Sequence, residues 1–270
     1  MASSTSIDTT TTTNGDAPPP EITIDYISSD QLTPLSNPDT QIQGLIAGLE
    51  SKNWIEVCES LNDTRRLALY HSDLLLPLIE PVMLILVKSI KNPRSALCKT
   101  TIMTAADIFT AYRDKLLEPT LSGAFDNLLL QLLLKASQDK RFVCEEADKT
   151  LNSMVQSITP LPVLQKLQTY AGHHNPKVRA KAATSLSNCV SRMSLEELQE
   201  FGLVLLVQSA AKLLNDRLPD AREAARNIIM SVYKLYPENE EQKQESWQNF
   251  CESNLPALHG QSIIKITTSH

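Results

Sequence analysis

Residues 175–186 read NPKVRAKAATSL, and this stretch shows most clearly how the chain folds. Asn175 can cap a helix by accepting a hydrogen bond from a backbone N–H, and Pro176 fits the first helical turn. The apolar residues that follow recur at helical spacing and form one stripe, which consists of Val178, Ala182, Ala183 and Leu186. The stretch therefore predicts a capped helix with one buried face.

Four other segments of the chain resemble this helix start, because each carries a basic or aromatic residue where a new helix begins. The five segments are Lys52-Asn53-Trp54, Lys91-Asn92-Pro93-Arg94, Asp139-Lys140-Arg141-Phe142, Asn175-Pro176-Lys177-Val178-Arg179 and Asn215-Asp216-Arg217-Leu218-Pro219. Counted from Asn53, Asn92, Asp139, Asn175 and Asp216, the intervals are 39, 47, 36 and 41 residues. Such intervals are typical of a two-helix HEAT or armadillo unit, and stacking the units would place the five loops on one edge.

The composition favours an all-α fold, since 42% of the residues are hydrophobic and only 7 of 270 are Gly. We expect a HEAT/armadillo-type α-solenoid of about five helical hairpins plus a capping helix. The expected helices are 42–50 with 54–70, 74–90 with 95–113, 119–137 with 142–157, 160–172 with 177–193, 195–214 with 220–236, and a cap at 240–255.

The ends of the chain are expected to lie outside this solenoid. Residues 1–40 contain a Thr run and Pro18-Pro19-Pro20 with no amphipathic period, so they predict a disordered or loosely docked tail. The solenoid is expected to span residues 41–265. After the cap, Leu255 to His270 is expected to trail out through Pro256 and Gly260, with residues 266–270 as a terminal tail.

The formal charge of −6 is unevenly distributed along the chain. Residues 41–235 hold 23 Lys and Arg against 20 Asp and Glu, a net +3, whereas the ends hold 2 against 11, a net −9. A mildly positive body with basic loops suits an acidic partner. It lacks the density of cations that tracking along phosphates requires, so nucleic acid is not expected as a partner.

Several other classes of protein are disfavoured. The apolar run from Leu74 to Val87 is interrupted by Pro77, Glu80 and Pro81 and is shorter than a membrane span, and the polar start of the chain is not a secretory signal. We therefore expect a cytoplasmic protein without a membrane partner.

The five cysteines suit neither a disulfide framework nor a zinc site, and are expected to be small buried residues: Cys58, Cys98, Cys144, Cys189 and Cys251.

No catalytic or cofactor motif is evident. The chain has no Gly-rich phosphate loop, no HExxH and no Cys-x-x-Cys, and the pair His173-His174 has no Cys, Asp or Glu at ligand spacing. We expect a protein that is not an enzyme and that needs no cofactor or metal.

Taken together, the five loops resemble those of the TOG domain, in the form found at the N-terminus of CLASP-type proteins and in related plant and ciliary single-TOG proteins. The resemblance rests on Trp54, on Asn-Pro-Arg-Ser in the second loop, on Asp-Lys-Arg-Phe in the third and on Asn-Pro-Lys-Val-Arg in the fourth. It covers residues 41 to about 265. It implies a flat array of HEAT units whose intra-pair loops bind αβ-tubulin.

The resemblance also implies a set of tubulin-binding residues, one or two in each loop. These are Trp54 in the first loop, Arg94 and its companion Lys99 in the second, Lys140 and Arg141 in the third, Lys177 and Arg179 in the fourth, and Arg217 in the fifth. The first loop departs from many TOG domains, because Ile55 and Glu56 follow the Trp where a basic residue is common.

Each candidate also has a purely structural interpretation. Trp54 can anchor the first repeat in the core, and the basic residues can form ion pairs between repeats with acids such as Asp63, Asp107, Asp126 or Glu146.

Two functions therefore remain open at this point. The chain is either a microtubule-associated protein of the cytoplasmic cytoskeleton that binds αβ-tubulin or microtubules, or a HEAT scaffold that binds other proteins through its helical face. Self-association is also left open.

Overall fold

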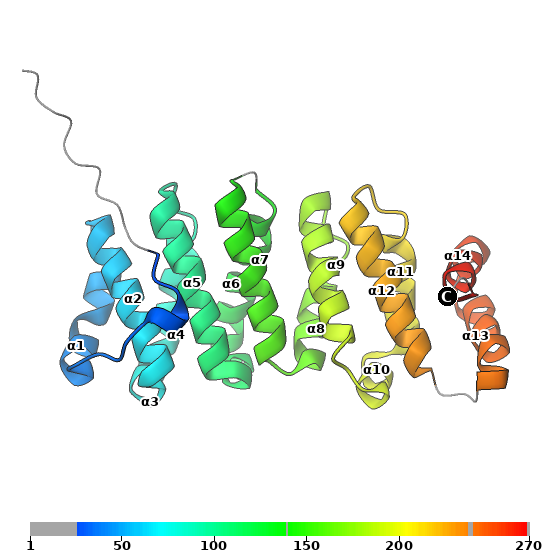
Figure 1. Ribbon diagram of the computed structural model, residues 1–270, viewed down its shortest axis with the longest axis horizontal. Coiled ribbons are helices and arrows are strands. Elements are labelled where there is room, and N and C mark those ends of the chain that lie inside the picture. The colour runs from blue at the N-terminus through cyan, green and yellow to red at the C-terminus, as the bar shows by residue number, and fades with distance from the viewer. Residues whose placement is uncertain (1–25, 139, 237–239, 269–270) are drawn as a thin grey trace, which may run out of the picture.

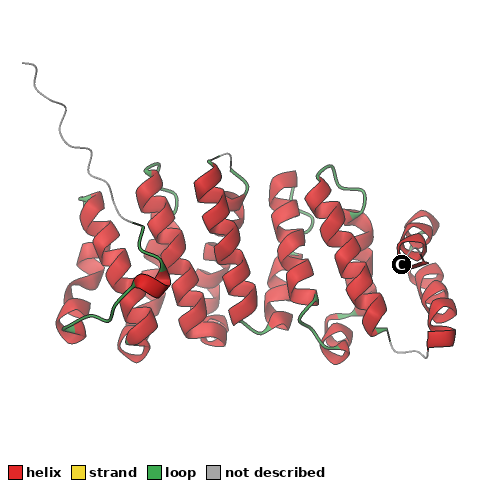
Figure 2. Ribbon diagram, in the orientation of Figure 1, coloured by secondary structure: helices red, strands yellow, loops and turns green. Residues whose placement is uncertain are grey.

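The computed structural model describes residues 26–138, 140–236 and 240–268, and within these ranges all regular structure is helical. The main helices form antiparallel pairs that stack side by side into a slab (Figure 1), and no strand interrupts them in the described part of the chain (Figure 2). The prediction of an all-α solenoid is confirmed.

Five pairs make up the array, and they match the predicted hairpins in order. They are α1 (Pro38–Leu49) with α2 (Trp54–Tyr70), α4 (Ile79–Ser89) with α5 (Ser95–Tyr112), α6 (Pro119–Ala136) with α7 (Arg141–Ser157), α8 (Pro160–Gln168) with α9 (Pro176–Val190), and α11 (Leu203–Leu213) with α12 (Pro219–Leu235). The second helices α2, α5, α7, α9 and α12 form the front row in Figure 1, and the first helices lie behind them.

The core between the two rows is built from the predicted stripes. Val178, Ala182, Ala183 and Leu186 of α9 are all buried, as are the equivalent apolar residues of the other helices. Of the cysteines, Cys144 is half-buried and the other four are buried, and none of the five forms a disulfide. Arg192 joins the third and fourth pairs by donating hydrogen bonds to the backbone carbonyls of Val155 and Ile158.

Two of the expected helices are broken. The span 74–90 begins instead as the short α3 (Ser72–Leu75) and the 3-10 turn η2 (Leu76–Leu78), because Pro77 has no N–H to donate to an α-helix. The span 195–214 divides into α10 (Leu195–Phe201) and α11 at Gly202, whose φ of 103° is readily adopted only by glycine. A further 3-10 turn, η3 (Arg113–Leu117), follows α5.

The prediction that residues 1–40 lie apart from the fold is wrong for residues 26–40. Residues 26–37, which we call the strap, include the turn η1 (Ser29–Gln31) and cross the front of α2 and α5 (Figure 1), and α1 begins at Pro38. Leu32 of the strap is buried. Beneath the strap, Arg65 of α2 pairs with Asp107 of α5 at 2.6 Å. The sequence did not reveal the strap because it has no helical period; residues 1–25 lie outside the described part of the chain.

The expectation that the chain trails out after residue 255 is also wrong for residues 257–268, and residues 269–270 lie outside the described part of the chain. After α13 (Glu240–Asn254) the chain forms another helix, α14 (Ala257–Thr268), which packs on α11, α12 and α13. Gly260 of α14 is buried and packs against the backbone of Cys251 in α13. Trp247 is fully buried against Tyr233 and Tyr236, which fixes α13 to the fifth pair. The cap is therefore a helical pair that closes the core.

Candidate interaction edge

Four of the five intra-pair loops contain the same local hydrogen bond. Each has an Asn or Asp whose side-chain oxygen accepts from the backbone N–H two residues later, at distances of 2.9–3.1 Å. The four residues are Asn53, Asn92, Asn175 and Asp216. This turn starts the second helix of each pair and explains why these residues marked the repeat in the sequence. In the remaining loop the corresponding Asp139 lies outside the described residues.

The five loops lie along one edge of the slab, the upper edge in Figure 1, and the connections between pairs lie along the opposite edge. We call this upper row, made of residues 50–54, 90–95, 137–138, 140–142, 169–179 and 214–218, the loop edge. The arrangement follows from the antiparallel pairing, which returns every intra-pair connection to the same side. The predicted candidates are therefore brought to one edge, but their environments differ.

Trp54 and Arg94 join the first two loops. The guanidinium carbon of Arg94 lies 5.5 Å from the centre of the Trp54 ring, within the range of a cation–π contact. Trp54 is half-buried and packs partly against the core, whereas Arg94 is exposed. Trp54 thus anchors the first repeat and also supports a cation at the surface.

The third loop presents two cations and an aromatic ring. Lys140 is exposed and donates a 3.3 Å hydrogen bond to Ser95 at the second loop. Arg141 pairs with Glu145 one turn later at 2.7 Å, and its side chain is 90% exposed. Phe142 is 43% exposed, so neither Arg141 nor Phe142 is turned into the core. An exposed ring beside two cations makes Phe142 a candidate that was not assigned from the sequence.

Lys99 and Arg179 form ion pairs between repeats, which is the structural interpretation that the sequence left open. Lys99 lies 3.6 Å from Glu146 of the next pair, and its side chain is only 20% exposed. Arg179 pairs with Asp216 of the fifth loop at 2.8 Å and donates to the backbone carbonyl of His173 at 2.7 Å. Both cations therefore hold neighbouring repeats together.

Burial and hydrogen bonding act in opposite directions on the pKa of Asp216. Burial raises it, but the hydrogen bonds from Arg179 and from the N–H of Leu218 outweigh burial, so the pKa lies below its ordinary value. The carboxylate is thus held ionised between the fourth and fifth loops, and the distance between these loops is fixed.

The remaining cations of the loop edge are exposed to solvent. Lys177 and Arg217 were assigned from the resemblance, and Lys52 and Lys91 are two more exposed cations beside them. Lys52 and Lys91 stand in the quoted loop segments, so their position was the signal that could have identified them. The edge consequently carries exposed positive charge in each of its five loops.

Neither a metal-binding cluster nor a membrane-spanning helix occurs among the described residues. They contain no group of three or more His, Cys, Asp or Glu placed to hold a metal ion. No described helix is both long and apolar enough to cross a membrane.

Comparison with known proteins shows the family to which this chain belongs. The family model described as CLASP N terminal matches residues 66–252. The mouse protein "TOG array regulator of axonemal microtubules protein 1" is 28% identical over 209 residues, which cover 76% of this chain and 12% of the mouse protein. Its human counterpart is 29% identical over 130 residues, 48% of this chain and 7% of that protein. The chain thus spans a small fraction of the length of these curated relatives.

Solved structures show the same fold at low sequence identity. The MAST/Orbit N-terminal domain is similar with a TM-score of 0.59 and 14% identity, covering 84% of this chain and 96% of that one. The TOG domain of Zyg9 from C. elegans gives a TM-score of 0.63 and 14% identity, covering 90% and 91%. Because the family model matches well over half of the 270 residues, the chain belongs to the CLASP N terminal family and has the fold of a TOG domain.

Proposed function

We propose that this chain is a non-enzymatic microtubule-associated protein whose loop edge binds αβ-tubulin or microtubules in the cytoplasm and so regulates their organisation or dynamics. The observation that carries the proposal is the row of exposed cations on five loops, with Trp54 and Phe142 beside them. A surface of this kind complements an acidic protein surface. Relatives support the choice of partner, since two are described as regulators of axonemal microtubules and one structure of this fold concerns tubulin recruitment.

Within this proposal the predicted residues divide into two groups. Arg94, Lys140, Arg141, Lys177 and Arg217 face the partner together with Trp54. Lys99 and Arg179 keep the loops in register, because each is already paired with an acid of the next repeat. The binding domain comprises residues 26–268, which include the strap and the helical cap.

Each exposed ion pair contributes only about 0–1 kcal/mol, so binding requires several loops to act together. A single loop variant, Lys177→Ala, should weaken binding to unpolymerised tubulin a few-fold. Adding Trp54→Ala should nearly abolish it, because the first and fourth loops are then both impaired.

The test is binding of the full chain and of both variants to tubulin by size-exclusion chromatography and to stabilised microtubules by co-sedimentation, with helicity checked by circular dichroism. A folded double variant that binds as well as the wild type would rule out the loop edge as the binding surface.

A further inference from the structure

The front row of helices already binds one segment through its backbone, namely the chain's own strap, which contains the turn η1. Arg65 donates a 2.7 Å hydrogen bond to the carbonyl of Ile27, and the Tyr70 hydroxyl donates a 2.6 Å hydrogen bond to the carbonyl of Leu32. The hydroxyl of Ser29 donates to Asp107. Polar side chains of α2 and α5 thus hold a non-helical segment of backbone, on both sides of the turn η1, across the front of the slab.

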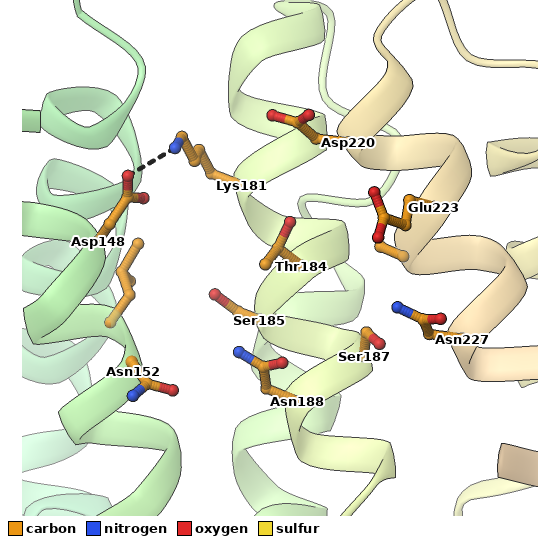
Figure 3. Close-up of a pocket in the computed structure, with 12 residues that line it drawn as sticks. Asp148, Asn152, Lys181, Thr184, Ser185, Ser187, Asn188, Asp220, Glu223 and Asn227 are labelled. Atoms are coloured by element: carbon orange, nitrogen blue, oxygen red, sulfur yellow. Dashed lines mark hydrogen bonds and ion pairs between the residues drawn. The ribbon is translucent and has the colours of Figure 1, made fainter. Parts of the chain in front are cut away.

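The same row continues beyond the strap into a groove over α7, α9 and α12. The groove has a volume of about 370 Å³ and is lined by polar side chains from all three helices (Figure 3). The groove and the strap lie at equivalent positions along their helices. Asp107, which contacts the strap, follows Arg94, the N-cap residue of α5, by 13 positions. Asn188 follows Asn175, the N-cap residue of α9, by the same 13 positions. Asn188 lines the groove.

Two largely buried serines line this groove. Ser185 and Ser187 of α9 are only 5% and 8% exposed, and neither hydroxyl makes a hydrogen bond within the described part of the chain. By contrast, Thr184 beside them bonds back to the carbonyl of Ala180 at 3.0 Å. Neither hydroxyl oxygen is shut off from the groove, so both can form a hydrogen bond with an N–H or C=O of a ligand there.

Three amide side chains surround the serines, one from each helix. Asn152, Asn188 and Asn227 line the groove, and their side chains make no hydrogen bond to another described residue. An amide carries both a donor and an acceptor, which is the complement of one peptide unit of an extended backbone. The groove therefore has the chemistry to hold a peptide by its main chain.

The charges of the groove select the kind of peptide. Asp148 is paired with Lys181 at 2.6 Å, whereas Asp220 and Glu223 of α12 make no ion pair with any described residue (Figure 3). The groove is thus net acidic. Residues 1–25 of the chain contain four Asp and Glu but no Lys or Arg, so charge does not favour them as the occupant.

We propose that this groove binds an extended segment of a partner protein that contains Lys or Arg. The Asn amides and the hydroxyls of Ser185 and Ser187 pair with its backbone, and Asp220 and Glu223 bind a basic side chain. The site lies on the helical face and does not depend on the function proposed for the loop edge.

The test uses the full chain and a fluorescein-labelled peptide of alternating Lys and Ser, eight residues long, with binding followed by anisotropy at about 50 mM salt. The double variant Asp220→Asn, Glu223→Gln should bind the peptide about tenfold more weakly. The control Glu200→Gln, Glu245→Gln, at exposed positions outside the groove, should bind it as the wild type does. A peptide of alternating Glu and Ser should not bind.

A second variant separates backbone recognition from charge. Asn188→Ala, Asn227→Ala should weaken binding several-fold without changing its salt dependence, because no charge is removed. The loop variant Lys177→Ala should bind the peptide normally. The proposal is overturned if the basic peptide does not bind, if both peptides bind equally, or if neither groove variant differs from the wild type.

Discussion

Asp216 connects two features of the loop edge within one side chain. One carboxylate oxygen accepts from the N–H of Leu218 and starts α12, and the other accepts from Arg179 of the neighbouring pair. The fifth loop is therefore shaped and positioned by the same residue. Protonation of the Asp216 carboxylate would therefore weaken its ion pair with Arg179.

We predict a pH-dependent contribution of Asp216 to stability. Its folded-state pKa is lowered, so the contribution is fully present above the unfolded-state pKa of about 4 and is lost as the pH falls through the folded-state value. At pH 7, Asp216→Asn should lower the free energy of unfolding by about 1–3 kcal/mol, while its amide oxygen keeps the turn. Urea denaturation of both proteins at pH 7 and pH 3 should give a difference that shrinks at the lower pH; a constant difference would contradict the ion-pair role.

We also predict that one thiol reacts in the native protein. Burial raises the pKa of Cys58 to about 11 and of Cys189 and Cys251 to about 12, and it raises the pKa of Cys98 as well. Buried neutral thiols react poorly because the thiolate is the nucleophile. Ellman's reagent at pH 8 should therefore label the half-buried Cys144 first, and Cys144→Ser should remove the fast phase.

At this scale the sequence predicts turn residues better than it predicts the partners of long side chains. Asn53, Asn92 and Asn175 act within two residues of their own position, so local pattern reveals them. Arg179 instead bonds a residue 37 positions away, and its own segment does not identify Asp216 as the partner.

Among the elements, the strap helps to hold the first two pairs together, because it bonds to both α2 and α5. It covers the Arg65–Asp107 ion pair, whose side chains are 1% and 6% exposed. The guanidinium also donates to Ile27 and Asn62, so the buried charge is well solvated by the protein. α2, α5 and the strap consequently share one polar network.

Removing one partner of this network should be costly. Asp107→Ala leaves the Arg65 charge buried and should lower the free energy of unfolding by about 3–5 kcal/mol. The double variant Arg65→Met, Asp107→Leu should be less destabilised than Asp107→Ala, because no charge remains unpaired. Chemical denaturation of the single and double variants measures this coupling, and additive effects would show that the pair is unimportant.

The elements predicted correctly are those with a strong helical period and a cap, such as α9. The strap and the break at Gly202 could not be predicted in the same way. The strap has no period of its own and is held by contacts with α2 and α5, and a lone glycine in a helical pattern does not reveal its φ.

At the scale of the whole molecule, antiparallel pairing separates the intra-pair loops from the connections between pairs. Every intra-pair loop returns to one edge, which carries the candidate cations, while the connections between pairs form the other (Figure 1). The sequence predicts this separation because the repeat interval fixes where each loop falls. It predicts the capping helix α13 but not the second helix, α14, in which Ile263 is buried against other segments.

The most direct test of the central claim compares cations on the two edges. Lys52 and Lys140 lie on the loop edge, and the exposed Lys115 and Lys234 lie on the opposite edge. Affinity for unpolymerised tubulin should be measured for Lys52→Glu, Lys140→Glu and for the matched control Lys115→Glu, Lys234→Glu, at low and moderate salt. We predict that the loop-edge variant loses affinity about tenfold or more and shows a weaker salt dependence, while the control binds as the wild type does. Equal loss in both variants, or loss only in the control, would contradict the assignment of the loop edge as the tubulin-binding surface.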